Sequence, residues 1–279
     1  MSKLRLGIVG ENISYTLSPR IFEWAFARME LDAEYRVYDL PADRAEAFIR
    51  GGEWDGLSVT VPHKTLAWNC CEGKTEDARK ASAANCLIKI QGEIGAENTD
   101  VRGCRSALAQ WNSEAAAILR TLIIGSGGAA RAARVAVTQS FPEARIALAT
   151  RDPEQARKRL RVQLDGDPDV DYLLPGDASD SLSEFDLIIQ ATPVGSVWAL
   201  GLPLPEPLRF KSGTRVLEMI YAPRDTAFMQ KARKQGARVQ NGIVMLIAQA
   251  GASFQRWTER PFPITEALET FAPEFGGEI

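Results

Sequence analysis

The stretch IIGSGGAARA, residues 123–132, sets the pattern G-x-G-x-x-A between a β-branched run and a helical pattern. Gly125 allows a tight turn after the strand, and Gly127 has no side chain that would keep a phosphate away from the backbone. Ala130 is small enough for helix and strand to pack closely. Free N–H groups at the start of the helix attract phosphate. The stretch therefore predicts a βαβ unit that binds a dinucleotide, against the alternative of a purely structural turn.

Apolar runs and helical patterns alternate on both sides of this loop, which is typical of a parallel sheet covered by helices. Downstream we expect helices at 104–111, 129–139 and 154–160 and strands at 121–124, 145–149, 187–191, 215–218 and 237–240. Upstream we expect helices from Ser18-Pro19 onward and at 42–50, and strands at 4–9, 35–40, 57–61, 86–90 and 93–96. Two final helices, at 242–257 and 265–271, have no strand after them.

The predicted fold class is α/β with two domains. Residues 1–103 form an N-terminal α/β substrate domain, and residues 104–242 form a Rossmann dinucleotide-binding domain. The C-terminal helices, within residues 243–279, return to complete the first domain. A chain of 279 residues is roughly 1.9 times the ~150 residues of a typical domain, so its length predicts two domains or one large one. We expect a cleft where the chain crosses between them.

Charge and cysteine content exclude several classes of protein. The 33 basic and 36 acidic residues nearly balance, so the chain has no basic surface for nucleic acid or for an anionic membrane. One His and four Cys without a C-x-x-C pair argue against a metal site, and adjacent Cys70 and Cys71 favour free thiols. No apolar run approaches the roughly 20 residues that cross a bilayer, and no signal peptide is recognisable. We expect a cytoplasmic protein, either a monomer or a homodimer.

The end of the second strand of the βαβ unit bears on the choice of dinucleotide. An acid at this point binds the ribose hydroxyls of NAD, whereas an Arg pairs with the 2′-phosphate of NADP. Thr150, Arg151 and Asp152 offer both types side by side, and Arg151 can also be a solvated surface charge. The sequence favours NADP and leaves NAD open, because a carboxylate beside a 2′-phosphate is repulsive.

Polar groups in the first half follow predicted strands, in SVTVPHK at 58–64, in Ala84-Asn85 and in NTD at 98–100. We expect each of them at the C-terminal end of a strand, where ligands bind in open α/β sheets. Without the other motifs, both residues have a structural interpretation. Lys64 would be a solvated lysine in the first turn of a helix, and Asp100 would be a helix N-cap.

Taken together in sequence order, the motifs between Leu6 and about Thr258 resemble those of the shikimate dehydrogenase family. Those that carry the resemblance are YTLSP at 15–19, SVTVPHK at 58–64, Asn85, NTD at 98–100, the loop at 125–131, DLIIQATPVG at 186–195, Tyr221 with Pro223 and Thr226, and Gly242, Met245, Gln249, Ala250, Phe254 and Trp257. Eight matches in family order make the resemblance specific.

The resemblance implies NADP-linked interconversion of 3-dehydroshikimate and shikimate, or the same chemistry on quinate. It implies Lys64 as general acid/base and Asp100 as the residue that orients it. It places the substrate at Thr16, Ser18, Ser58, Thr60, Asn85, Tyr221 and Gln249. It places the cofactor at Gly125, Ser126, Gly127, Gly128, Ala129, Thr150, Arg151, Thr192, Pro193, Ile220, Gly242 and Met245. No metal is required, because nicotinamide itself takes the hydride.

Several residues depart from the family pattern. Thr16 replaces a Ser, Ser58 an Asn and Cys86 a Thr, and Tyr15 stands where many relatives have His. These changes leave the substrate open to quinate, an amino-shikimate or another polyol acid. A non-catalytic dinucleotide sensor is the third alternative, and loss of the Lys and Asp pair would be its mark.

Two further residues attract a functional interpretation. His63, the one histidine, matches a position that the family does not use chemically, and we expect it to be exposed. Gln249 interrupts an apolar helix, so its amide needs either a polyol ligand or a hydrogen bond between helices.

Overall fold

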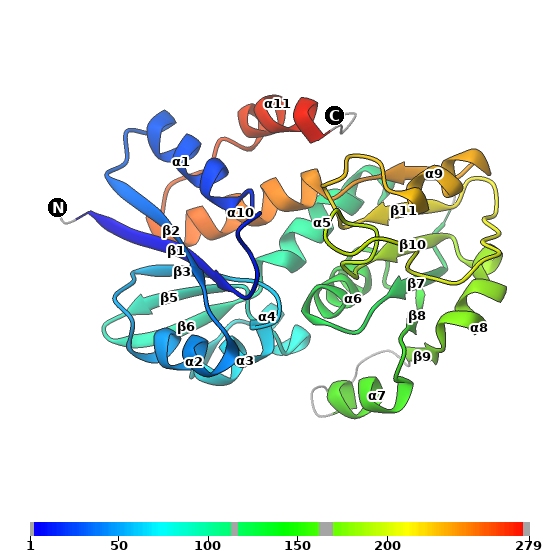
Figure 1. Cartoon of the computed structure of the whole chain (residues 1–279), viewed down its shortest axis with the longest axis horizontal. Coiled ribbons are helices and arrows are strands. Elements are labelled where there is room, and N and C mark those ends of the chain that lie inside the picture. Colours follow the sequence, from blue (N-terminus) through cyan, green and yellow to red (C-terminus); the bar gives the residue numbers. More distant parts are fainter. Residues whose placement is uncertain (1–2, 113–116, 162–169, 276–279) are drawn as a thin grey trace.

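The computed structural model describes residues 3–112, 117–161 and 170–275, which form two six-stranded sheets (Figure 1). The strands of the first sheet are, in spatial order, β2 (Ala33–Asp39), β1 (Leu4–Gly10), β3 (Gly56–Val59), β5 (Cys86–Ile90), β6 (Glu93–Glu97) and β4 (Gly73–Lys74). Those of the second are β12 (Arg238–Gln240), β11 (Arg215–Glu218), β10 (Leu187–Gln190), β7 (Arg120–Ile124), β8 (Arg145–Ala149) and β9 (Val170–Leu173).

The helices lie mainly between the strands in the sequence. They are α1 (Ser18–Arg28), α2 (Ala42–Gly51), α3 (Lys64–Cys70), α4 (Glu76–Ala81), α5 (Thr99–Asn112), α6 (Gly128–Ser140), α7 (Pro153–Arg161), α8 (Pro175–Asp180), α9 (Ala227–Lys234), α10 (Ile243–Thr258) and α11 (Ile264–Phe275), with a short 3₁₀ turn at Leu182–Glu184. Six short elements are not predicted from the sequence pattern, namely α3, α4, α8, α9, β4 and β9. All of them have eight residues or fewer, too few for a clear hydrophobic period.

The second sheet is entirely parallel and has the strand order of a dinucleotide-binding fold. From β7 the chain proceeds to β8 and β9 on one side, and then to β10, β11 and β12 on the other. The reversal of direction leaves a crevice at the C-terminal ends of β7 and β10, where such sheets bind ligands.

The first sheet is mixed. Strands β2, β1 and β3 are parallel, whereas β5 runs antiparallel to β3 with Ser58 opposite Cys86. Asn85 therefore precedes a strand, so the expectation that it follows one is wrong. The antiparallel pairing nevertheless brings it to the edge where β3 ends, because the start of one strand lies beside the end of its partner.

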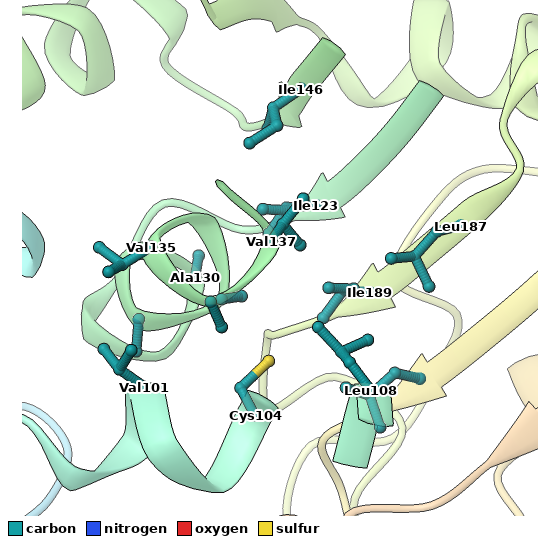
Figure 2. Packing of buried hydrophobic residues seen from close by; sticks show 14 of the residues in the cluster. Val101, Cys104, Leu108, Ile123, Ala130, Val135, Val137, Ile146, Leu187 and Ile189 are labelled. Carbon is teal, nitrogen blue, oxygen red and sulfur yellow. The ribbon is translucent and has the colours of Figure 1, made fainter. Parts of the chain in front are cut away.

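Helix α5 packs on the second sheet and begins at Thr99, not at residue 104 as expected. Figure 2 shows Val101 and Cys104 of α5 facing Ala130 of α6 in the cluster that also contains Ile123 and Ile189. This early start places Asp100 in the first helical turn, where the positive end of the helix dipole favours a carboxylate.

Helix α10 returns the chain to the first sheet. Ile247, Phe254 and Trp257 pack in the cluster of α1 and β1, while Met245 joins the cluster of the second sheet. The backbones of α5 and α10 approach closely at Gly103, where a Cβ would lie 2.6 Å from the Met245 carbonyl oxygen. The domain limits at 103 and 242 remain a prediction.

None of the helices within the described ranges is long and apolar enough to cross a membrane. In the same part of the chain no three His, Cys, Asp or Glu side chains are grouped as metal ligands. The four cysteines are free and buried.

Gly56 allows the close packing of β3 against α10, and its replacement tests this contact. A Cβ on Gly56 would lie 2.5 Å from Trp257 Cδ1 and 2.7 Å from Leu6 Cδ2, so Gly56→Ala forces two buried side chains apart. We expect the free energy of unfolding to fall by about 1–3 kcal/mol in urea denaturation. Gly51→Ala at the end of α2, with open space at its Cβ, is the control and should not lower the free energy of unfolding. Equal effects would contradict this packing.

Candidate active site

A cavity of about 270 Å³ lies between loops of the first sheet, loops of the second sheet and helix α10. Its lining includes the predicted catalytic and substrate residues Lys64, Asp100, Thr16, Ser18, Ser58, Thr60, Asn85, Tyr221 and Gln249. It also includes six predicted cofactor residues, Ala129, Thr192, Pro193, Ile220, Gly242 and Met245. The other six, Gly125, Ser126, Gly127, Gly128, Thr150 and Arg151, lie outside this lining, in or next to the turns after β7 and β8.

Lys64 and Asp100 form an ion pair on the wall of this cavity. The Lys64 ammonium donates to Asp100 Oδ2, and the two side chains are 14% and 7% exposed. Lys64 is the first residue of α3, and Asp100 lies in the first turn of α5. Asn85 Nδ2 donates to the second carboxylate oxygen at 2.9 Å, so both oxygens of Asp100 have partners. The carboxylate is fixed, while the ammonium keeps further hydrogens for a ligand.

Asn85 connects this pair to two helices. Its Oδ1 accepts from the Thr99 amide at 2.6 Å, and the Thr99 hydroxyl lies 2.9 Å from that of Ser253 on α10. Its Nδ2 also donates to Gln249 Oε1 at 3.3 Å. Gln249 Nε2 in turn donates to the Leu246 carbonyl of its own helix. Gln249 thus forms a hydrogen bond to another element and also lines the cavity. Its amide can therefore have both the structural role and the ligand-binding role that the sequence left open.

Hydroxyl groups gather at the end of the cavity near β1 and α1. Thr16 donates its hydroxyl to Ser18 Oγ at 3.2 Å. Asp39, at the end of β2, holds the preceding loop by accepting from the amides of Asn12 and Ile13 at 2.7 and 3.1 Å. The loop is therefore fixed before any ligand binds.

Tyr35 supports the same end of the cavity and was missed in the sequence analysis. Its hydroxyl donates to Ser58 Oγ at 2.8 Å, and both residues are buried. Burial raises the pKa of Tyr35 well above its usual range, although the bond to Ser58 opposes this effect. The alternating pattern of β2 indicates a strand but does not reveal which hydroxyl Tyr35 contacts.

Two buried side chains fix the loops of the second sheet that face the cavity. Gln190 donates to the carbonyls of Thr192 and Val194 at 3.0 and 2.9 Å, and accepts from the Thr192 amide at 2.7 Å. Glu218 accepts from the Thr226 hydroxyl at 3.0 Å and from the Ile220 amide at 3.3 Å. Burial raises the pKa of Glu218 to about 8, although its hydrogen bonds oppose this effect.

The glycine loop after β7 approaches the ion pair. Gly125 has a φ of +117°, which an L side chain rarely adopts, and Gly127 has open space where a Cβ would be. Gly128, the first residue of α6, packs on Lys64: a Cβ there would lie 2.9 Å from Lys64 Cδ and 3.1 Å from Lys64 Cβ. The start of α6 therefore limits where the lysine stem can lie.

The turn after β8 carries Arg151 and Asp152, whose side chains differ in their hydrogen bonds. Asp152 Oδ1 accepts from the Gln155 amide at 2.8 Å, which is a cap for the start of α7. Arg151 is exposed, and its guanidinium forms no hydrogen bond or ion pair with any residue in the described ranges. Among the described residues, the acid therefore has a structural partner and the base has none.

Two further residues near the cavity were predicted wrongly or not singled out from the sequence. His63 is buried, with 1% exposed, and not exposed as predicted, because its Nε2 contacts the Leu40 carbonyl at 2.7 Å. Trp198, which the sequence analysis did not single out, lines the cavity and stacks on Tyr15. A tryptophan between Gly195 and Gly201 in a loop is the local signal that could have drawn attention to it.

Comparison with known proteins gives a consistent result. Residues 8–87 match the family model described as the shikimate dehydrogenase substrate binding domain. A shikimate dehydrogenase (NADP(+)) of Anaeromyxobacter dehalogenans is 35% identical over 275 residues, which cover 94% of this chain and 95% of that protein.

Solved structures confirm the predicted fold class. A chorismate mutase/shikimate 5-dehydrogenase fusion protein of Clostridium acetobutylicum is 27% identical with a TM-score of 0.79, covering 99% of each chain. A quinate dehydrogenase of Corynebacterium glutamicum in complex with NAD, at 21% identity, shares the fold with a TM-score of 0.80, covering 97% of this chain and 99% of that one. The extent and identity of the match to the Anaeromyxobacter protein show that this chain belongs to the shikimate dehydrogenase family.

Proposed function

We propose that this protein is an NADP-dependent oxidoreductase that interconverts 3-dehydroshikimate and shikimate. The observation that carries the proposal is the Lys64 and Asp100 pair, which lines one cavity together with Ala129 and Met245 on the predicted cofactor side. A proton donor and a hydride donor must reach adjacent atoms of one carbonyl group. A single cavity lined by both the ion pair and the predicted cofactor residues supports such an approach.

The residues present fit a dinucleotide. The open space at Gly127 admits a pyrophosphate close to the backbone, and the start of α6 offers N–H groups to it. Arg151 is available for a 2′-phosphate, while Asp152 is held by α7. Ala129, Ile220 and Met245 would hold the nicotinamide end. When bound, the cofactor supplies or accepts the hydride.

The residues of the first sheet would then hold the acid and move the proton. Thr16, Ser18 and Tyr221 would bind its carboxylate, and Ser58, Thr60, Asn85 and Gln249 its ring hydroxyls. In reduction, Lys64 gives a proton to the carbonyl oxygen while hydride arrives at the carbon. In oxidation, Lys64 takes that proton back from the hydroxyl. Asp100, fixed by Asn85, keeps the ammonium directed at this oxygen.

A related acid is the second candidate, favoured by the contact between Ser58 and Tyr35. Ser58 is shorter than the Asn of the family pattern, and its hydroxyl already accepts a hydrogen bond from Tyr35. A shorter side chain at this position would leave room for a further ring substituent, as in quinate. The intact ion pair argues against a non-catalytic sensor, because paired titratable groups in a cavity are typical of active sites.

The proposal is tested by mixing the protein with NADP or NAD and with shikimate or quinate, while nicotinamide absorbance is followed. We expect the fastest turnover with NADP and shikimate. Lys64→Ala should lower kcat by about 10²- to 10⁴-fold, because the proton then has no positioned carrier. Lys234→Ala, at the exposed end of α9, is the control and should leave kcat unchanged. Absence of turnover with every cyclohexene and cyclohexane carboxylate would overturn the proposal.

Gly128 should affect the chemical step through Lys64. Gly128→Ala pushes on the lysine stem, and a displacement of this kind should lower kcat by about tenfold or more. Gly127→Ala adds a methyl group toward the predicted pyrophosphate, so it should mainly raise KM for NADP. Steady-state kinetics of both variants separate the two effects. The interpretation of Gly128 is wrong if its variant changes only KM for the cofactor.

Arg151 should distinguish the two dinucleotides. Removing a charge-assisted bond to a 2′-phosphate costs about 1.5–3 kcal/mol, so Arg151→Ala should weaken NADP binding by about tenfold to a hundredfold. NAD binding should change little, because NAD lacks that phosphate. Titration of both dinucleotides measures this, with Arg145→Ala at the start of β8 as the control. Equal loss for both would rule out the assigned role.

A further inference from the structure

Tyr15 and Trp198 form an aromatic stack that joins the two halves of the molecule. Their ring centroids are 3.6 Å apart and their planes differ by 24°. Tyr15 belongs to the loop between β1 and α1 of the first sheet, and Trp198 to the loop after β10 of the second. Both line the cavity, and they are 43% and 50% exposed. The stack therefore lies at the boundary between the cavity and solvent.

Each ring comes from a loop with its own internal hydrogen bonds. The Thr16 amide donates to the Ile13 carbonyl at 3.0 Å, next to the amides that Asp39 holds. On the other side, the buried Ser196 hydroxyl accepts from the amides of Trp198 and Ala199 at 3.4 and 3.2 Å. The two rings are thus presented by ordered turns, so they meet with little further loss of conformational freedom.

The stack lies beside the hydroxyl groups that would hold the substrate carboxylate. Tyr15 directly precedes Thr16, whose hydroxyl bonds to Ser18, and Trp198 follows two residues after Ser196 on the cavity wall. A small acid held at Thr16 and Ser18 would be covered by the two rings, whereas a bulky group beside the carboxylate would collide with them. Separation of the rings widens the mouth of the cavity, because each ring belongs to a different half.

We propose that Tyr15 and Trp198 form an aromatic clasp that closes over the carboxylate end of the substrate and selects small cyclic acids without a bulky group there. This inference rests on the proposed function, since it assigns the carboxylate to Thr16 and Ser18. The clasp contributes to retention of the acid and takes no part in proton transfer, which Lys64 performs on another wall of the cavity.

The test is a double-mutant cycle on the complete enzyme with saturating NADP and varied shikimate. An aromatic stack is worth about two- to tenfold in binding, so Tyr15→Ala and Trp198→Ala should each raise KM by about that factor. The double variant should be no worse than either single one, because each single change already removes the stack. Trp198→Phe, which keeps an aromatic ring, should restore most of the affinity.

The control is Leu200→Ala on the same loop, 85% exposed and outside the cavity lining, which should leave KM unchanged. If the two alanine effects multiply in the double variant, or if KM does not change, the clasp is refuted while the activity stands. If the unmodified protein neither turns over nor binds any cyclic acid in calorimetry, the proposed function fails and the clasp with it.

Discussion

The ion pair between Lys64 and Asp100 is the contact that determines how the rest of the site is arranged. Both charges are largely removed from water, and a buried charge without its partner is strongly destabilising. The chain therefore has to bring the start of α3 and the start of α5 together. Asn85 completes the carboxylate's hydrogen bonds, so the antiparallel strand β5 is needed as well. The start of α3, the start of α5 and the residue before β5 therefore meet at one point.

The second half of the molecule is positioned relative to this same point. Helix α6 begins with Gly128 against the stem of Lys64, and its buried Arg131 and Arg134 donate to the carbonyls of Ser82 and Lys80 at the end of α4. On the other side, α5 and α10 pack closely at Gly103. These contacts hold the glycine loop beside Lys64, so the two are positioned together.

The sequence pattern predicted the parts of the fold that depend on interactions between residues close together in the sequence. Five of the six strands of the second sheet and the glycine turn followed from hydrophobic runs and a required backbone conformation, whereas β9 was not predicted. The start of α5 at Thr99 was not predicted, because Thr99-Asp100 is equally typical of a cap that precedes a helix. The buried state of His63 and the Tyr35 to Ser58 bond depend on contacts across 23 residues of sequence, for which one sequence carries no signal. The same holds for Trp198, whose partner lies on the other sheet.

Three of the residues that depart from the family pattern gather at one end of the cavity, whereas Cys86 is buried next to Asn85. Thr16 and Ser58 lie among the hydroxyl groups near β1 and β2, with Tyr15 above them, and their contacts are with Ser18, Tyr35 and Trp198. The ion pair and Asn85 have a separate set of partners on α5 and α10. Within the described part of the chain no side-chain hydrogen bond joins the two networks, so a substitution in one removes no hydrogen bond of the other. This separation fits the proposed function, in which the recognised acid can change while the proposed proton transfer at Lys64 is preserved.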